Sequence, residues 1–319
     1  MGAPFIIGHR GASGERPEHT LAAYTLAFNQ GADFVEPDVV PTKGGHLIAR
    51  HENEISGTTD VADHPEFADR KATKTIDGQT LTGWFTEDFT LAELMTLHAR
   101  ERLPQLRPAN AAWRDEKIVT LDALIDLARS RGRGVVAEIK HSSYFGSVGL
   151  PIETKLVETF ARHGWSRRSD PVWIESFEVN NLKALRGMTD LKLVQLLEEK
   201  NGPADGGAQS YAAMTTLAGL KAVAAYADGI GPAKALIVPR DGEGRSLAPT
   251  SLVADAHAAG LKVIPWTFRS ENFFLPAELR DGPDPRAHGR ADAELKMFAA
   301  AGVDGLFTDF PGEAVRALK

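Results

Sequence analysis

Short apolar runs alternate along the chain with longer segments in which apolar residues recur every three or four positions. A short apolar run that ends at glycine or at a polar residue is typical of a buried strand, whereas the three-to-four spacing predicts an amphipathic helix. Strands are predicted near residues 5–8, 34–38, 134–140, 172–177, 191–196, 228–231, 261–267 and 305–309. Eight strands that alternate with helices predict an α/β fold, a TIM (β/α)₈ barrel.

The helices expected between these strands cover residues 20–30, 121–131, 151–163, 208–227, 251–259 and 291–301. The clearest of them is 121–131, where four apolar residues spaced for one helical face are expected to be buried, namely Leu121, Leu124, Ile125 and Ala128. Thr120 stands directly before this helix, in the position of an N-terminal cap.

The regular spacing breaks once. The second predicted strand begins near residue 34 and the third near residue 134. A βα unit of a barrel spans roughly 35 residues, so residues 52–117 are predicted to be an insertion on the catalytic rim. This segment is rich in turns and mixed charge, with one helix-like piece near residues 90–100. Because composition does not change elsewhere, residues 1–319 are predicted to form a single domain that contains the insertion.

Composition narrows the classes of partner. The 319 residues include 43% hydrophobic and 25% charged residues, which is ordinary for a globular protein. The net charge of -7 argues against broad binding to nucleic acid or to anionic membranes, since both require a basic surface. The absence of cysteine excludes disulfides, zinc-thiolate sites and a cysteine nucleophile.

No apolar run approaches the roughly 20 residues of a membrane-spanning helix, so no integral membrane segment is expected. The first strand begins a few residues after Met1, which leaves no room for a signal peptide. The chain as it stands is therefore expected to be cytoplasmic, or periplasmic if an N-terminal signal has been removed from it. Its oligomeric state does not follow from the sequence.

Two histidines follow early strands. The first apolar run stops at Gly8, so His9 and Arg10 are expected at the tip of the first strand. The apolar residues 47–49 bring the chain back and are followed by His51. Most of the ten histidines are expected to be ordinary surface residues. His9 and His51 differ because a barrel places its catalytic groups at strand ends.

Carboxylates also lie near strand ends. Glu36 and Asp38 are two residues apart, so on a strand they share a face while Pro37 points the other way. Because Pro37 lacks an N–H, the pair is expected where the strand pairing runs out. Glu138 and Lys140 repeat the two-residue spacing on the third strand. These carboxylates are either ordinary surface or salt-bridge groups, or ligands of a cation. Carboxylates buried together repel one another unless a cation neutralises them, which favours the second interpretation. Ligands that are all oxygen favour Mg²⁺ or Ca²⁺.

Several motifs resemble the signature of the glycerophosphodiester phosphodiesterases, a family that adopts the TIM barrel. They are His9-Arg10-Gly11, Pro17-Glu18-His19-Thr20, Glu36-Pro37-Asp38 and His51, and the similarity extends to residues 138–140, 263–268 and 303–311. The resemblance therefore covers nearly the whole chain. Two positions depart from the family pattern, since His19 stands where asparagine is usual and Glu52 where aspartate commonly follows the second histidine.

The resemblance implies a role for each candidate residue. His9 and His51 would be the general acid and general base, while Glu36, Asp38 and Glu138 would hold one divalent cation, Mg²⁺ or Ca²⁺. Arg10 and Lys140 would bind the phosphate, although either can also form structural ion pairs with the acidic cluster. Phe177 and Trp266 would line the pocket for the glycerol or the leaving group. The alternative is that they are aromatic residues of the barrel core or of a lid.

The expected reaction is hydrolysis of a small glycerophosphodiester to sn-glycerol 3-phosphate and an alcohol. The attacking group is either water or the 2-hydroxyl of the substrate's own glycerol. Two alternatives remain, a phosphodiesterase that resembles sphingomyelinase D and a catalytically silent barrel that only binds phosphodiesters. The sphingomyelinase D-like enzymes carry disulfides, which this chain cannot form. Amidohydrolase barrels have two histidines separated by one residue on the first strand, and His9-Arg10-Gly11 lacks that pattern.

Overall fold

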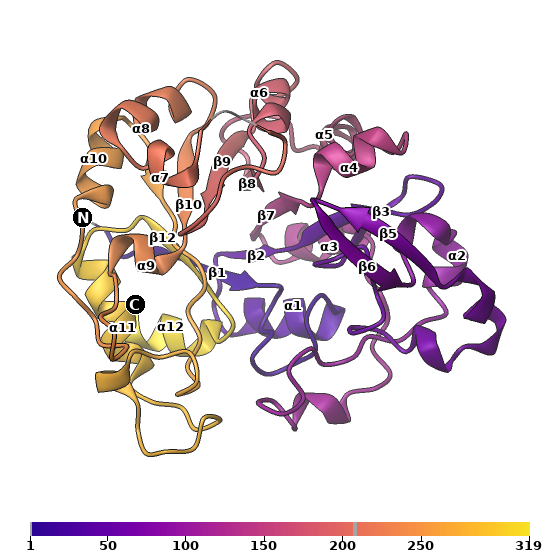
Figure 1. Cartoon of the computed structure of the whole chain (residues 1–319), viewed down its shortest axis with the longest axis horizontal. Helices are drawn as coiled ribbons and strands as arrows, with labels where there is room; N and C mark the ends of the chain where they lie inside the picture. Colours follow the sequence, from indigo (N-terminus) through magenta and orange to yellow (C-terminus); the bar gives the residue numbers. More distant parts are fainter. Residues whose placement is uncertain (1, 207–208) are drawn as a thin grey trace.

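Parallel strands form a nearly closed barrel with helices around its outside (Figure 1), as seen in a computed structural model that describes residues 2–206 and 209–319. Within those residues, eight strands of the barrel follow one another in the order β11-β10-β9-β8-β7-β2-β1-β12. Their bounds are β1 Phe5–His9, β2 Phe34–Glu36, β7 Gly134–Ile139, β8 Val172–Ser176, β9 Lys192–Leu197, β10 Gly229–Pro232, β11 Lys262–Val263 and β12 Gly305–Thr308. The predicted (β/α)₈ class is confirmed.

Backbone hydrogen bonds between the seventh and eighth strands bring the barrel close to closure. The N–H of Asp304 donates to the carbonyl of Val263 over 2.9 Å, and the N–H of Phe307 donates to the carbonyl of Pro265 over 3.1 Å. The seventh strand was expected over residues 261–267, yet β11 covers Lys262–Val263 alone. Pro265 has no N–H to donate, so the regular ladder stops before it while the chain runs on beside β12.

The second strand is interrupted at Pro37. Glu36 ends β2 and pairs with His9 of β1, whereas Asp38 begins β3 (Asp38–Pro41) and pairs with Glu138 of β7. The ladder was expected to run out here; it resumes, and β3 forms an antiparallel hairpin with β4 (Leu47–Ala49). The N–H of Glu138 donates to the carbonyl of Pro37 over 2.9 Å. This bond brings the third carboxylate beside the first two.

Helices connect the strands and cover the barrel. The longer ones are α1 Leu21–Asn29, α3 Leu121–Ser130, α5 Glu153–Arg162, α6 Asn180–Arg186, α8 Leu217–Val223, α10 Leu252–Ala258, α11 Ala291–Ala300 and α12 Pro311–Leu318. Shorter pieces are α2 Leu91–Leu94, α4 Ser142–Ser147, α7 Tyr211–Met214 and α9 Lys234–Ile237, with 3₁₀ turns at Val61–Asp63, Pro65–Arg70, Thr86–Asp88, Asn110–Ala112 and Ala277–Leu279. None of the helices in the described ranges is both long and apolar enough to cross a bilayer.

Two helix predictions show the limits of pattern reading. The expected helix 121–131 is found as α3, its four apolar residues are buried, and Thr120 caps it by accepting a hydrogen bond from the N–H of Ala123. The expected helix 208–227 is two helices, α7 and α8, each with its own cap at Ser210 and Thr216, while residue 208 lies outside the described residues. Capping side chains start a new helix where the periodicity alone suggests continuation.

The core consists of a large cluster between the sheet and the helices and a smaller cluster inside the barrel. The inner cluster contains the inward-facing strand residues Ile7, Val136, Trp173, Val194, Ile264 and Phe307. A filled interior is what a small barrel requires, since alternate strand residues pack in layers across it. Chemistry is therefore confined to the end of the barrel where the strands finish.

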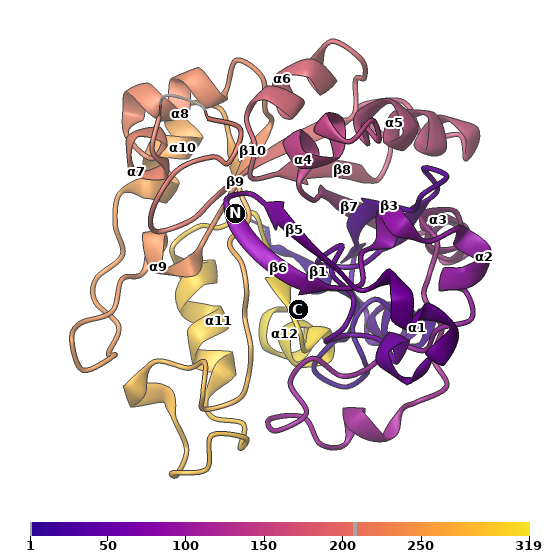
Figure 2. The same ribbon diagram turned by 45° about the vertical axis from the view of Figure 1, so that its right-hand side comes forward.

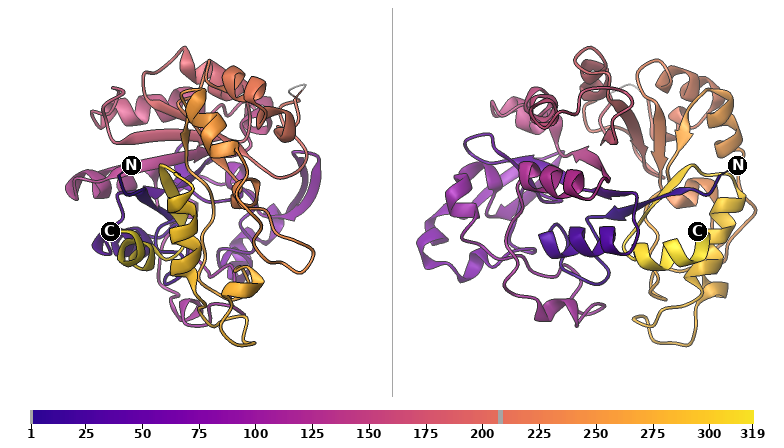
Figure 3. Two further views of the ribbon diagram at one scale, coloured as in Figure 1. Left: turned by 90° about the vertical axis from the view of Figure 1, so that its left-hand side faces the viewer. Right: turned by 180° about the vertical axis from the view of Figure 1, so that it is seen from behind.

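Residues 52–117 lie between β4 and α3 and include the hairpin of β5 (Ala72–Ile76) and β6 (Gln79–Gly83). The hairpin lies in front of the barrel in Figure 2, and the two views of Figure 3 show the molecule from the side and from behind. The helix expected near residues 90–100 is only the single turn α2. Arg50, fully buried, joins this segment to the barrel by donating to the carbonyls of Thr58 and Glu18, each over 2.9 Å.

Gly134 tests the packing of the third strand. A Cβ at this position would lie 2.3 Å from the ring of Phe34 and 2.5 Å from the carbonyl oxygen of Pro171. We expect Gly134→Ala to lower the free energy of unfolding by about 1–3 kcal/mol, because such overpacking must be relieved by movement of the neighbouring strands. Gly146→Ala is the matched control, since nothing lies within 4 Å of its added methyl group. Urea denaturation that gives equal stabilities for the two variants would contradict this packing.

Candidate active site

A cavity of about 820 Å³ opens at the carboxyl ends of the strands. Eight of the nine residues singled out from the sequence line it: His9, Arg10, Glu36, His51, Glu138, Lys140, Phe177 and Trp266. The ninth, Asp38, is buried beside them, with 1% of its surface exposed. Residues spread over more than 250 positions of the chain thus meet at one end of the barrel, where this fold places its chemistry.

Three carboxylates form a compact buried cluster. Glu36, Asp38 and Glu138 each offer a carboxylate oxygen within 4.8 Å of the others. Lys140 Nζ lies 2.7 Å from Glu138 Oε1 and 3.0 Å from Asp38 Oδ1, so one cation already offsets part of the charge. Glu36 Oε1 is buried and has no hydrogen-bond partner among the described residues. An all-oxygen donor set with an unpartnered buried oxygen fits a hard divalent cation such as Mg²⁺ or Ca²⁺.

The pKa values show how strained this cluster is without further positive charge. Burial, followed by repulsion from Asp38, raises the pKa of Glu36 well above its usual range. Burial also raises the pKa of Glu138 to about 8, against the opposing effect of Lys140. For Asp38 the balance is reversed: burial alone would raise its pKa, but Lys140 and neighbouring cations hold it well below the ordinary value. Positive charge beyond that of Lys140 and Arg10 would relieve the two glutamates.

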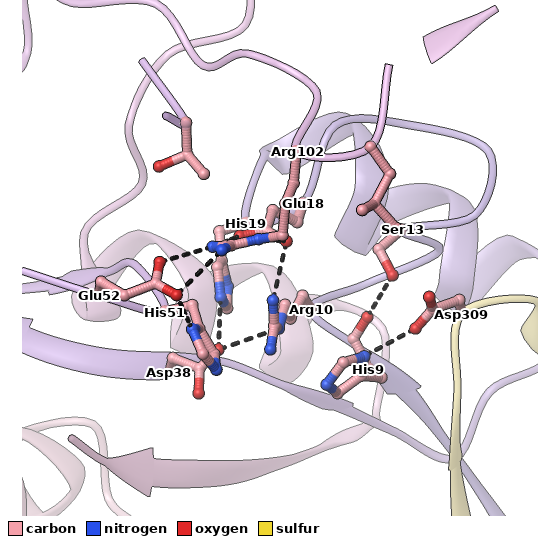
Figure 4. A network of polar contacts seen from close by, with 12 residues as sticks. His9, Arg10, Ser13, Glu18, His19, Asp38, His51, Glu52, Arg102 and Asp309 are labelled. Atoms are coloured by element: carbon pink, nitrogen blue, oxygen red, sulfur yellow. Dashed lines mark hydrogen bonds and ion pairs between the residues drawn. The ribbon is translucent and has the colours of Figure 1, made fainter. Parts of the chain in front are cut away.

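His9 is held by Asp309, the residue that follows β12. Its Nδ1 lies 2.7 Å from Asp309 Oδ1, a contact drawn as a dashed line in Figure 4. Burial, followed by the charge of Arg10, lowers the pKa of the His9 imidazole to about 4. The ring is therefore neutral near pH 7. A neutral imidazole that donates its Nδ1–H to a carboxylate keeps the lone pair of Nε2 free for proton transfer.

His51 is held in the same way by its neighbour. Its Nδ1 lies 2.5 Å from Glu52 Oε1. Burial, then Arg10 and Lys140, lower the pKa of the His51 imidazole to about 3. Although Glu52 replaces the usual aspartate of the resembled motif, its longer side chain still reaches Nδ1. Both histidines thus present Nε2 as the atom available for proton transfer.

His19, the second departure from the motif, holds a carboxylate of the cluster. It is fully buried, its Nε2 lies 2.8 Å from Asp38 Oδ2, and its Nδ1 lies 2.7 Å from the hydroxyl of Tyr24. Its backbone φ of 57° falls in the left-handed region, which asparagine and histidine adopt more readily than most residues. Burial lowers the pKa of His19 to about 4, so its ring is neutral near pH 7. It fixes the orientation of the Asp38 carboxylate through Oδ2.

Arg10 and Lys140 serve the cluster and also face the cavity. The backbone N–H of Arg10 donates to Glu36 Oε2 over 2.8 Å, and its guanidinium lies 3.2 Å from Asp38 Oδ2. Arg10 Nη1 also donates to Glu18 Oε2 over 2.9 Å. Ion pairing with the acidic residues is therefore part of the role of both cations. Because both also line the cavity, they remain positioned to contact an anionic ligand.

Two of the aromatic residues that line the cavity pack against each other. The ring centroids of Phe177 and Trp266 are 5.7 Å apart in an edge-to-face arrangement. Trp266 Nε1 donates to the carbonyl of Gly231 over 2.7 Å, which fixes the indole. Phe177 also packs edge-to-face against Tyr211, whose hydroxyl donates to the carbonyl of Phe177 over 3.2 Å. Phe177 and Trp266 therefore form a fixed aromatic part of the cavity lining, and the charged Lys140 lies next to it, with Nζ 5.9 Å from the centroid of the Phe177 ring.

The structure adds residues that the sequence analysis did not single out: Glu18, Arg102, Arg107, Glu175 and Asp309. Glu175 is the second-last residue of β8, as Glu138 is of β7. The two residues pair in register and Glu175 is 2% exposed, so the same strand-end signal applies to it. Asp309 follows β12 in the same manner. Arg102 and Arg107 lie in irregular sequence, where no periodic pattern marks a position as functional.

Comparison with known proteins agrees with this geometry. A family model described as the glycerophosphoryl diester phosphodiesterase family matches residues 9–313. Glycerophosphodiester phosphodiesterase GDPD6 of Arabidopsis thaliana is 38% identical over 97% of this chain and 84% of its own length. A glycerophosphodiester phosphodiesterase of Haemophilus influenzae is 31% identical over 98% of this chain and 89% of its own.

Solved structures show the same fold at lower identity. A crystal structure from Silicibacter pomeroyi has a TM-score of 0.71 and 22% identity and covers 99% of this chain and 93% of its own. A phosphodiesterase of Oleispira antarctica, solved with the product sn-glycerol-3-phosphate, has a TM-score of 0.66 and 21% identity over 99% of this chain and 97% of its own. The sequence matches reach from the first histidine to the last helix, so the chain is an enzyme of the glycerophosphoryl diester phosphodiesterase family.

Proposed function

We propose that this enzyme hydrolyses small glycerophosphodiesters to sn-glycerol 3-phosphate and an alcohol, with a divalent cation at the acidic cluster and with His9 and His51 as proton-transfer groups. One observation carries the proposal. Two neutral imidazoles, each with Nδ1 bound to a carboxylate, line the same cavity as two cations and two carboxylates of the acidic cluster, whose third carboxylate is buried beside them. General acid–base work on a phosphodiester requires such a pair of groups beside a site of positive charge.

The relatives support the substrate class. Two proteins that align with nearly the whole chain are named glycerophosphodiester phosphodiesterases, and the Oleispira antarctica enzyme was solved with sn-glycerol-3-phosphate. The cavity agrees in character, because its lining combines charged side chains with the aromatic rings of Phe177 and Trp266. A glycerol phosphate would place its phosphoryl group at Arg10 and Lys140 and its carbon chain or leaving group toward Phe177 and Trp266.

The residues divide the chemistry between them. One histidine takes the proton of the attacking hydroxyl at its free Nε2. The other is neutral in the free enzyme and first takes up a proton from solvent at Nε2, which the negative charge of the bound phosphodiester favours. It then donates that proton to the departing alkoxide. Arg10 and Lys140 bind the non-bridging oxygens, which gain negative charge in the transition state. When bound, the cation would add positive charge next to the same oxygens. The scheme accommodates attack by water or by the glycerol 2-hydroxyl.

The cation requirement has a direct test. We expect the purified enzyme to release glycerol 3-phosphate from glycerophosphocholine, to lose this activity in a chelator, and to regain it when Mg²⁺ or Ca²⁺ is restored, because the buried glutamates need a compensating charge. Product is measured with a coupled glycerol 3-phosphate assay. Turnover that is unchanged by thorough removal of divalent cations would contradict the proposed role of the cluster.

Separate roles for the histidines and the carboxylates predict different failures. His9→Ala and His51→Ala are each expected to lose about 10²- to 10⁴-fold in kcat, as loss of a general acid or base usually does. Both are expected to keep the rise in melting temperature caused by Mg²⁺ or Ca²⁺, since a ligand that binds only the folded state stabilises it. Asp38→Asn is expected to weaken that rise.

His46→Ala is the matched control, because His46 is exposed and lies on the hairpin between β3 and β4. It is expected to keep both kcat and the thermal shift. A His51→Ala protein that loses its metal-dependent shift, together with an Asp38→Asn protein that keeps it, would reverse the assigned roles.

A further inference from the structure

We infer that the segment 100–110 positions both histidines: Arg102 acts on His51 through Glu52, and Arg107 acts on His9 through Asp309. The inference rests on the proposed function, since it presumes that the two imidazoles transfer protons. Neither arginine contacts the acidic cluster among the bonds of the described residues, so each acts as a positioning residue through a carboxylate. Residues 52–117 would then complete the active site in addition to covering it.

Arg102 grips the carboxylate that holds His51. Its Nη1 donates to Glu52 Oε1 over 2.9 Å and its Nη2 donates to Glu52 Oε2 over 2.8 Å. Oε1 is the same oxygen that lies 2.5 Å from His51 Nδ1 (Figure 4). A two-point contact with a planar guanidinium fixes the plane of a carboxylate as well as its position. The direction of the imidazole is thereby set by Arg102.

Glu52 needs such a partner more than an aspartate would. Its side chain has one more rotatable bond than aspartate and is 32% exposed. Within the described part of the chain, its carboxylate has hydrogen bonds only to His51 and Arg102. Without the arginine, the longer side chain can turn toward solvent and release Nδ1 of His51.

Arg107 holds the corresponding carboxylate for His9. Its Nη2 donates to Asp309 Oδ2 over 2.6 Å, while His9 Nδ1 lies on the other oxygen, Oδ1, at 2.7 Å. Its Nε donates to Glu271 Oε1 over 2.6 Å. Arg269 Nε shares Asp309 Oδ2 at 2.8 Å, so this carboxylate has two arginine partners. The support of His9 is therefore duplicated, whereas that of His51 depends on one side chain.

One turn of backbone joins the two arginines. The N–H groups of Leu106 and Arg107 both donate to the carbonyl of Leu103, over 2.9 Å and 2.8 Å. Arg107 Nη1 also donates to the carbonyl of Ser13, 3.0 Å away, and the Ser13 hydroxyl donates to the carbonyl of His9. A short, internally bonded turn thus contacts the supports of both imidazoles.

A second route from Arg102 leads to the phosphate site and must be separated from the first. Arg102 also donates to both oxygens of Glu18, from Nε over 2.9 Å and from Nη2 over 2.6 Å. Glu18 in turn accepts from Arg10 Nη1. If Arg102 matters mainly through Glu18, its removal would loosen Arg10 and weaken substrate binding, which raises KM. If Arg102 matters mainly through Glu52, its removal would misplace His51 and lower kcat.

The test compares Arg102→Met, Arg102→Lys and Arg100→Met in the full-length enzyme with divalent cation supplied and glycerophosphocholine as substrate. We expect Arg102→Met to lose about 10- to 100-fold in kcat with little change in KM, as misplacement of a catalytic group by about 1 Å does. Arg102→Lys is expected to recover part of the loss, because a lysine supplies the charge without the two-point contact.

Arg100→Met is the matched control. Arg100 lies in the same segment with a similar exposed fraction, 26% against 28% for Arg102, and its carboxylate partner is Asp60, which bonds neither histidine of the site. It is expected to keep the kcat of the unmodified enzyme. Thermal unfolding of each variant checks that the proteins are folded at the assay temperature.

A double variant identifies the route. If Arg102 acts through Glu52, kcat of Glu52→Gln/Arg102→Met equals that of Glu52→Gln alone, because residues that act through one another are not additive. Three results would overturn the inference: unchanged kcat in folded Arg102→Met, a change in KM alone, or full additivity in the double variant. Failure of the proposed function is distinct, since it would appear as an unchanged kcat in His51→Ala.

Discussion

Mutual repulsion among buried carboxylates is the constraint on which the rest of this active site depends. Glu36, Asp38 and Glu138 offer oxygens within 4.8 Å of one another in a part of the protein that water barely reaches. Charges placed so close in a medium of low polarity are unfavourable unless opposite charge is supplied. Lys140 and Arg10 supply part of it. The negative charge that these two residues leave uncompensated suits the site to a divalent cation.

The barrel makes this concentration of charge possible. Residues two apart on a strand face the same side, and parallel strands end at a common rim, so Glu36, Asp38 and Glu138 meet without a long loop. Pro37 interrupts the strand between Glu36 and Asp38, and its carbonyl accepts a hydrogen bond from the N–H of Glu138. The neutral histidines belong to the same balance. Burial, and then nearby cations, lower their pKa values, and carboxylates on Nδ1 keep each ring in the orientation that frees Nε2.

Sequence reasoning predicted the barrel and placed His9, His51 and the three carboxylates at strand ends because both depend on local, periodic signals. Phe177 and Trp266 were proposed only through the family resemblance. A strand-end histidine or carboxylate is visible wherever an apolar run stops, and this rule would also have found Glu175 and Asp309. It fails for Arg102 and Arg107, which lie in irregular sequence and matter only through contacts 50 and 202 residues away along the chain. The break between α7 and α8 was missed because Thr216 caps a second helix inside a continuous apolar pattern. Long-range pairing and local capping are the features that periodicity does not contain.

The central claim is that His9 and His51 are neutral near pH 7 and carry their proton on Nδ1, with Nε2 free for proton transfer. Nitrogen NMR of the imidazole side chains, assigned with His9→Gln and His51→Gln, measures charge and tautomer for each ring. For the enzyme without substrate, the account predicts two neutral rings at pH 7 with protonated Nδ1, because burial and nearby cations lower the pKa values to about 4 and about 3. A cationic ring, or a neutral ring protonated on Nε2, at either position would contradict it.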